Sequence, residues 1–297
     1  MPAAESPADG SRAADPFAEH RDVLFAIAYR MLGTVSDAQD AVQDAWLRWA
    51  AVDPATVRHP RAYLIRTISR LSLDRLRSAT SRREVYVGPW LPEPLDTGPD
   101  VAEKVALSDS VSMALLVVLE TLSPLERAVF VLREAFDLPY GEIADALGST
   151  EPAVRQVAHR AREHVAARRP RYDSDPRRHR TVSERFLAAC TGGELSELVD
   201  VLAPDVVLVA DGGGVIRAPR MPLRGALTVA KFLLYSLREA PDDMRIVRRS
   251  LNGATGLVAF AGEVPIGTVV LDADGDRVAA IYLTANPGKL GTLAAPA

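Results

Sequence analysis

The chain has 297 residues, a composition typical of globular proteins, a net charge of −4 and an isoelectric point of about 5.8. It is long enough for two or three domains, each with its own hydrophobic core. The acidic balance excludes a protein that coats nucleic acid through its overall charge, so any DNA contact must come from local basic patches. The single cysteine, Cys190, excludes an internal disulfide and a cysteine-based metal cluster.

The first 16 residues are small, polar and proline-containing, which predicts disorder. They lack the basic start and apolar run of an export signal, and no stretch of the chain reaches the length of a membrane span. We therefore expect a cytoplasmic protein with no membrane contact.

Two helices are predicted next, over residues 22–32 and from Ser36 to Trp49, with Gly33 ending the first. Ser36 and Gln39 form a capping-box pair for the second helix. Its outer face is either a solvated surface or a docking surface for a partner helix. That face carries Asp37, Asp40, Gln43, Asp44, Leu47 and Arg48.

An arginine-rich segment follows the turn at Asp53 and Pro54, with a helix expected from Ala62 to about Arg77. Arginine without lysine favours planar contacts with phosphates and bases over diffuse attraction. The segment therefore forms a basic surface, made of Arg58, His59, Arg61, Arg66, Arg70, Arg75 and Arg77, with Arg82 and Arg83 beyond.

Residues 84–100 are rich in proline and glycine, which predicts a linker. Because Tyr86, Trp90 and Leu91 are too apolar for a freely solvated tether, we expect the middle of the linker to lie against a folded domain. A helix over residues 100–119 follows.

Residues 122–169 have the pattern of a helix-turn-helix. Ser123 and Glu126 cap a helix that Pro139 ends, residues 140–147 form a second helix closed by Gly148, and Thr150 caps a third. A helical hairpin with a solvated face is the plainer interpretation, but the clustered basic and polar side chains favour DNA binding. They are Arg155, Gln156, His159, Arg160 and Arg162.

The last third reads as an α+β domain after a basic linker over residues 170–180. Two helices are expected over residues 182–202 and one over 226–238, with strands over 205–210, 244–249, 256–260, 265–272 and 278–283. Asp205, Asp211 and Glu263 are candidate general bases, but no histidine accompanies them, so ligand sensing or scaffolding is favoured over catalysis.

Several of these segments, in this order, resemble bacterial extracytoplasmic-function sigma factors reduced to their second and fourth conserved regions. The matching segments are Asp37-Ala38-Gln39-Asp40-Ala41-Val42-Gln43-Asp44-Ala45 with Trp46 and Leu47, Pro60-Arg61-Ala62-Tyr63-Leu64, Asp74-Arg75-Leu76-Arg77, and residues 122–169.

The resemblance implies a task for each surface. The outer face of residues 37–48 would bind the clamp helices of the largest subunit of core RNA polymerase, and the arginine surface would open and read the −10 element. The loop over residues 53–61 would hold a flipped-out base. Thr150, Arg155, Gln156, His159 and Arg160 would face the −35 duplex, with Arg133 on a phosphate.

Three short motifs resemble the subgroup whose sigma core carries a C-terminal SnoaL-like domain, a cone-shaped α+β fold. In that subgroup the domain acts in cis, in place of an anti-sigma protein. The motifs are Trp90-Leu91-Pro92-Glu93-Pro94, Asp211-Gly212-Gly213-Gly214 and Asn286-Pro287-Gly288-Lys289-Leu290.

The predicted organisation is a multi-domain protein with two all-α sigma domains and a C-terminal α+β SnoaL-like cone. The boundaries are residues 1–16, a disordered start; 17–83, region 2; 84–105, a linker; 106–170, region 4; 171–181, a second linker; and 182–297, the regulatory domain. We expect a monomeric sigma factor without catalytic residues, metal or cofactor, whose last domain could take a small-molecule ligand. The alternative is a one-component helix-turn-helix regulator with a ligand-binding or cyclase-like domain.

Overall fold

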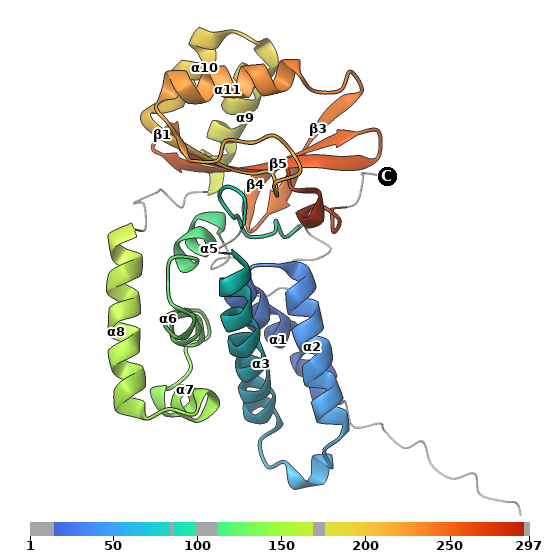
Figure 1. Cartoon of the computed structure of the whole chain (residues 1–297), viewed down its shortest axis with the longest axis vertical. Helices are drawn as coiled ribbons and strands as arrows, with labels where there is room; N and C mark the ends of the chain where they lie inside the picture. The colour runs from blue at the N-terminus through green and yellow to red at the C-terminus, as the bar shows by residue number, and fades with distance from the viewer. Residues whose placement is uncertain (1–14, 84–85, 99–111, 169–175, 294–297) are drawn as a thin grey trace, which may run out of the picture.

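The computed structural model describes residues 15–83, 86–98, 112–168 and 176–293. A helical part and a C-terminal sheet domain lie end to end, and the linker of residues 86–98 runs between them (Figure 1). Most of the residues expected to be disordered, and parts of both linkers, fall outside the described residues. The expected fold class, helical domains followed by an α+β domain, is confirmed.

Three helices form the first helical unit: α1 (Pro16–Leu32), α2 (Val35–Ala50) and α3 (Pro60–Arg83). Helix α1 begins earlier than expected because the Asp15 carboxylate accepts a hydrogen bond from Phe17 N, 3.0 Å away, and caps it. The predicted Ser36 cap is wrong. Thr34 caps α2 instead, its hydroxyl accepting from Asp37 N at 3.2 Å.

Over residues 112–168, the described part of the second helical unit, the elements are α5 (Met113–Leu119), α6 (Pro124–Phe130), the π-helical turn η3 (Val131–Ala135), α7 (Tyr140–Leu147) and α8 (Glu151–Arg168). The Ser123–Glu126 capping box is present, and Gly148 closes α7 with a φ of 65°. Of the helix expected over residues 100–119, residues 100–111 lie outside the described part. One continuous apolar core runs through both helical units, from Phe17 to Val165.

The sheet domain begins with α9 (Pro176–Gly192) and α10 (Leu195–Val201) and also contains α11 (Ala226–Arg238). Its strands, in the sheet order β2-β1-β6-β5-β4-β3, are β1 (Leu202–Asp211), β2 (Leu223–Arg224), β3 (Met244–Leu251), β4 (Ala254–Ala261), β5 (Val264–Asp274) and β6 (Arg277–Thr284). Strands β3 to β6 are antiparallel, whereas β1 pairs with β6 in parallel. The parallel pairing brings Asp211 beside Thr284, at the ends of both strands.

The three helices cover one face of this sheet, and the linker covers the other. Leu91 is fully buried in a separate apolar cluster with Met113 of α5 and with Phe260 and Tyr282 of the sheet. This confirms the prediction that the middle of the linker lies against a folded domain. Within the described residues, no helix combines the length and hydropathy needed to cross a bilayer.

Candidate functional site

The outer face of α2 presents both charge and exposed apolar surface. Leu47 is 53% exposed and Trp46 is 47% exposed. The helical pattern had not placed Trp46 among the outward residues, although its position beside Leu47 was a signal. Asp40, Gln43 and Arg48 are also exposed, whereas Asp37 and Asp44 are half-buried.

The acids of α2 are partly neutralised by α3. Arg75 lies 2.7 Å from the Asp44 carboxylate and 3.7 Å from that of Asp40, and it donates to the Asp37 carbonyl at 3.4 Å. Arg75 therefore joins two helices and is not part of the basic surface on which the sequence pattern had placed it.

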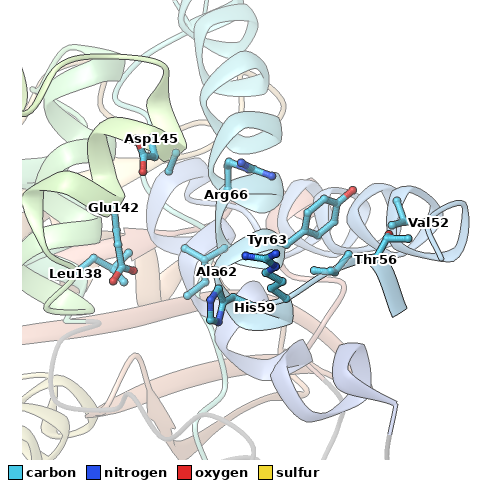
Figure 2. Close-up of a pocket in the computed structure, with 13 residues that line it drawn as sticks. Val52, Thr56, His59, Ala62, Tyr63, Arg66, Leu138, Glu142 and Asp145 are labelled. Carbon is cyan, nitrogen blue, oxygen red and sulfur yellow. The ribbon is translucent and has the colours of Figure 1, made fainter. Parts of the chain in front are cut away.

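The predicted −10 surface contains a cavity of about 490 Å³ (Figure 2). One side comes from the loop before α3 and the first turns of that helix. Figure 2 shows His59, Tyr63 and Arg66 on this side, and the guanidinium of Arg66 lies 5.6 Å from the Tyr63 ring centroid. Arg58, His59, Arg61, Arg66, Arg70 and Arg77 are all exposed.

The opposite wall of the cavity belongs to the helix-turn-helix. Leu138, Glu142 and Asp145 come from α7 and the loop before it (Figure 2). Arg70 fixes this closure, because it donates to the carbonyl of Ala146 at 2.8 Å and to that of Asp145 at 3.0 Å. These carbonyls are at the negative end of α7, where a guanidinium is favourable.

A second contact between the helical units is buried. Arg127 of α6 donates through Nε to the Arg30 carbonyl of α1 at 3.0 Å and also pairs with Glu120. Arg127 is only 1% exposed, so this contact is not a surface ion pair. The two helical units are therefore joined by Arg70 and by Arg127.

The exposed face of α8 carries the side chains predicted to face a −35 duplex. Arg155, Gln156, His159 and Arg160 are exposed, and Thr150 caps the helix with its hydroxyl 3.4 Å from Ala153 N. Three of the four side chains have acidic neighbours. Arg155 pairs with Glu151, His159 lies 3.3 Å from Glu163, and Arg160 lies 3.8 Å from Glu126.

Arg133 does not stand out toward solvent. It donates to the Leu138 carbonyl at 3.0 Å, pairs with Asp137 at 3.1 Å, and lies 5.0 Å from the centroid of the Tyr140 ring. These contacts hold the turn between η3 and α7. The structure thus gives Arg133 a positioning contact with the helix-turn-helix, besides the phosphate contact that the sequence suggested.

The linker is held by a buried ion pair of the sheet domain. Lys289 Nζ lies 2.7 Å from the Asp211 carboxylate, and both side chains are almost completely buried. Asp211 also accepts from Leu91 N at 2.9 Å, and Lys289 donates to the Leu91 carbonyl. The Trp90 ring centroid is 3.8 Å from Nζ, which adds a cation–π contact. Together we call these residues the linker clamp.

Tyr86, one of the apolar linker residues expected to lie against a folded domain, completes the linker clamp. Its hydroxyl lies 2.5 Å from the second Asp211 oxygen and accepts from Asn286 Nδ2 at 2.7 Å. Burial and the bond to Asp211 raise the pKa of Tyr86. Gly213 is required here, because a Cβ at this position would lie 2.5 Å from the Asn286 amide.

Gly212 and Gly214 complete this loop, and Pro287 begins the 3-10 turn η4 (Pro287–Lys289) that carries the lysine. A Cβ on Gly212 would lie 2.3 Å from the Ile216 carbonyl oxygen, so only glycine fits at position 212. The structure therefore brings together the three motifs that the family resemblance marked, at residues 90–94, 211–214 and 286–290.

Glu93 connects the linker to the first helical unit. Its carboxylate accepts from Val35 N at the start of α2, 2.8 Å away, and from Thr292 Oγ1 at 3.2 Å. Its backbone N–H donates to the Gly33 carbonyl at 2.8 Å. Burial raises the pKa of Glu93, and the hydrogen bond from Val35 N opposes that shift. Pro92 and Pro94 are buried on either side of it.

Asn252 links all three parts of the chain and was missed by the sequence analysis. Its amide nitrogen donates to the Tyr29 hydroxyl of α1 at 2.7 Å, and its amide oxygen accepts from Leu95 N at 3.1 Å. Tyr29 in turn donates to the Glu93 carbonyl at 2.7 Å. The signal was Asn252-Gly253, a hairpin dipeptide whose residues have φ values of 51° and 74°.

The candidate general bases of the sheet domain are not gathered in one site. Asp205 and Glu263 are exposed, and Asp211 is committed to the linker clamp on the linker side of the sheet. A cavity of about 460 Å³ lies on the helix-covered side, and none of the three acids lines it.

Comparison with known proteins supports this organisation. The family model Sigma-70 region 2 matches residues 17–82, and Sigma-70, region 4 matches residues 112–165. The ECF RNA polymerase sigma factor SigJ of Mycobacterium tuberculosis is 38% identical over 283 residues, which cover 91% of this chain and 90% of SigJ. The probable ECF RNA polymerase sigma factor SigI of the same species is 33% identical and spans 93% of this chain and 94% of SigI.

The likeness includes the C-terminal sheet domain. The crystal structure of M. tuberculosis SigJ superposes with a TM-score of 0.75 at 33% identity, covering 93% of this chain and 97% of that one. The chain has both sigma regions in sequence order, and its third domain is arranged as in SigJ. The chain belongs to the extracytoplasmic-function RNA polymerase sigma factors.

Proposed function

We propose that this chain binds core RNA polymerase and directs it to start transcription at specific promoters, under the control of its own C-terminal domain. The observation that carries the proposal is the presence, in one chain, of an exposed α2 face and two separate arginine-bearing surfaces, on α3 and on α8. A one-component repressor would need only the last of these.

Each surface has its own task. Asp37, Asp40, Gln43, Asp44, Leu47 and Arg48 of α2 bind the clamp helices of the largest polymerase subunit, and exposed Trp46 adds apolar area to that contact. The surface around the 490 Å³ cavity holds the −10 strand, in which positive charge offsets the cost of unpairing a base. The exposed face of α8 enters the major groove of the −35 duplex.

The free chain is closed toward −10 DNA. Glu142 and Asp145 face the cavity in which the strand would lie, and Arg70 is hydrogen-bonded to the end of α7. A phosphate backbone entering this cavity would meet two carboxylates, which repel it. Binding to core polymerase therefore has to separate α7 from α3, and that separation also frees Arg70.

The C-terminal domain modulates activity through the linker clamp. Because the linker and the sheet domain belong to one chain, the contact between them forms at high effective concentration. The linker clamp and Asn252 hold Tyr86, Leu91 and Leu95 of the linker on the sheet domain. They therefore limit how far the two DNA-binding surfaces can move apart.

The units of this activity are residues 17–83, 106–170 and 182–297, with linkers predicted over residues 84–105 and 171–181. Residues 176–181 of the second predicted linker form the start of α9 and so extend the last unit. The free protein is a monomer, and the role needs neither a catalytic group nor a cofactor. It also places the chain in the cytoplasm with the polymerase and the chromosome.

Transcription with purified core polymerase on a library of promoter fragments tests the proposal. The full chain is expected to give transcripts from defined start sites, and Leu47→Ala with Trp46→Ala should abolish them while α8 still binds duplex DNA. The exposed pair Leu227→Ala and Val264→Ala, in the C-terminal domain, is the matched control. Operator binding without any association with core polymerase would instead identify a one-component regulator.

The part played by the C-terminal domain needs a separate test. A chain that ends before Val182 keeps both sigma regions and the linker but lacks Asp211 and Lys289. We expect its promoter-specific activity to differ from that of the full chain. Equal activity at every promoter would show that the domain does not modulate initiation.

A further inference from the structure

The C-terminal domain contains a cavity of about 460 Å³ between α9, α11 and the sheet. Its lining is mostly apolar and includes Phe186, Phe232, Ile246, Leu257 and Val269. A cavity of this size and lining is typical of sites that enclose drug-sized molecules.

Among the described residues, Arg217 and Glu239 are the charged ones that line the cavity, and the rest of the lining is neutral. The Ser236 hydroxyl donates to the Phe232 carbonyl at 2.9 Å, and burial raises the pKa of Cys190 to about 12, so that thiol stays neutral. Arg217 and Glu239 also line the cavity, but both are exposed and therefore lie at its mouth. Because burying an unpaired charge is costly, the occupant must be apolar in its body, with any polar group at the mouth.

One wall of the cavity is also a wall of the linker site. Residues 216–218 line the cavity, and together with residues 214 and 215 they line a second hollow of about 240 Å³ shared with Val87 and Gly88 of the linker. A Cβ on Gly214 would lie 3.3 Å from the Val87 Cβ. The 212–218 loop is therefore sandwiched between the cavity and the linker.

A second wall joins the cavity to the linker clamp directly. Ala285 lines the cavity, and its backbone N–H donates to the Asp211 carbonyl at 2.8 Å. The next residue, Asn286, donates to the Tyr86 hydroxyl at 2.7 Å. Both loops that hold the linker thus contribute to the lining of the cavity.

We propose that this cavity binds a predominantly apolar, drug-sized molecule, and that this molecule strengthens the docking of the linker. The second half rests on the proposed function, in which linker docking modulates initiation. The cavity has its full lining only while the 212–218 loop is in the linker-bound position. A molecule that fits it binds that state more tightly and shifts the population toward it. By reciprocity, a docked linker raises the affinity for the molecule by the same factor.

The first experiment uses the neutral dye N-phenyl-1-naphthylamine, whose fluorescence rises in apolar surroundings, with the full chain. We expect saturable binding of one dye per chain. Ala259→Phe, which fills the cavity from β4, should abolish it. Val264→Ser removes an apolar side chain that is 64% exposed in the same domain and should leave the dye affinity unchanged.

Cys190 gives a readout that needs no substitution, because it lines the cavity and is the only cysteine of the chain. Saturating dye is expected to slow its modification by methyl methanethiosulfonate. This measurement holds even if Ala259→Phe fails to fold.

The coupling is tested with Asp211→Asn, which weakens the linker clamp without touching the cavity. We expect dye affinity to fall about fivefold or more. The inference would be overturned by any of three results: equal dye affinity in Ala259→Phe, no protection of Cys190 by the dye, or unchanged dye affinity in Asp211→Asn. None of these measurements uses polymerase, so a negative result would not affect the transcription result. A negative transcription result would likewise leave the dye measurements valid.

Discussion

The Lys289 ammonium lies 2.7 Å from the Asp211 carboxylate in a site where the two side chains are 7% and 0% exposed. The pair is not isolated, because Leu91 contributes its N–H to the acid and its carbonyl to the base. Because the linker backbone supplies two of the hydrogen bonds to this charged pair, the pair is fully satisfied in its buried site only when the linker is bound. The linker and the sheet domain are therefore stabilised together.

Replacing the base of this pair tests that dependence. Lys289→Met leaves the Asp211 carboxylate buried without its cation, which should lower the free energy of unfolding of the sheet domain by about 3–5 kcal/mol. Urea titration followed by circular dichroism measures it, and Lys231→Met on exposed α11 is the matched control. Equal midpoints for both variants would contradict the assignment. Adding Asp211→Asn to Lys289→Met should recover part of the loss.

Tyr29→Phe tests the contact among α1, the linker and Asn252. The substitution removes the hydroxyl that donates to the Glu93 carbonyl and accepts from the Asn252 amide. A buried group left without its partner costs about 1–3 kcal/mol. The amides of Leu95 and Asn252 should then exchange with solvent roughly 5 to 150 times faster. Tyr235→Phe, on the exposed face of α11, should leave their exchange unchanged.

Stability should also depend on pH through Asp272. Burial raises the pKa of this carboxyl from 3.8 to about 6, against a smaller opposing effect of Tyr282 and His179. The folded state therefore holds a proton that the unfolded state releases, so stability falls as pH rises from about 4 to 6, by up to about 3 kcal/mol. Glu93, whose pKa burial also raises, acts in the same direction.

Asp272→Asn should remove this part of the dependence. We expect the variant to gain stability relative to the original chain as pH rises, measured by urea unfolding at pH 4.5 and pH 7. Asp274→Asn, at an exposed position two residues later, serves as the control. A constant difference at both pH values would show that Asp272 does not titrate in this range.

The closure between α3 and α7 depends on Arg70. Arg70→Ala removes two hydrogen bonds from a guanidinium to helix-end carbonyls in a partly exposed position, a loss of about 1 kcal/mol. The free chain should open more often, seen as a larger radius of gyration in X-ray scattering. Arg77→Ala, whose side chain pairs with Asp74 on the same helix, should leave the radius unchanged.

Base recognition by α8 is tested with Gln156→Ala. A side chain that reads one base pair in the major groove contributes about 1–3 kcal/mol of discrimination. Transcription from a preferred promoter should therefore fall about 5- to 150-fold, while binding to core polymerase and to unrelated duplex DNA stays the same. An equal loss on all DNA would mean that Gln156 contacts the backbone.

The sequence correctly predicted those helix ends that depend on interactions between residues close together in the chain. Gly148 and the Ser123–Glu126 box each act within a few residues, and both are where the pattern placed them. The predicted Ser36 cap was wrong by two positions, because Thr34 also carries a hydroxyl and capping patterns at neighbouring residues are nearly equivalent. The role of Arg75 was missed because its partners lie on another helix.

The contacts that hold the domains together could not be derived from spacing. Tyr29 and Asn252 are separated by 223 residues, and Tyr86 and Asp211 by 125. The periodic patterns that reveal helices and strands extend over only a few residues, so they carry no information about contacts this far apart in the sequence. The motifs at residues 90–94, 211–214 and 286–290 were identified through the family resemblance, which marked them as related without giving their contacts.

Lys289 follows both DNA-binding units in the sequence, and this order has a consequence during synthesis. It joins an acid 78 residues earlier and a linker carbonyl 198 residues earlier. Domains generally fold in order as they leave the ribosome. Both DNA-binding units are therefore synthesised before Lys289, the residue that holds the linker between them. Every newly made copy therefore passes through an unsecured stage, which a ribosome stalled after residue 168 would prolong.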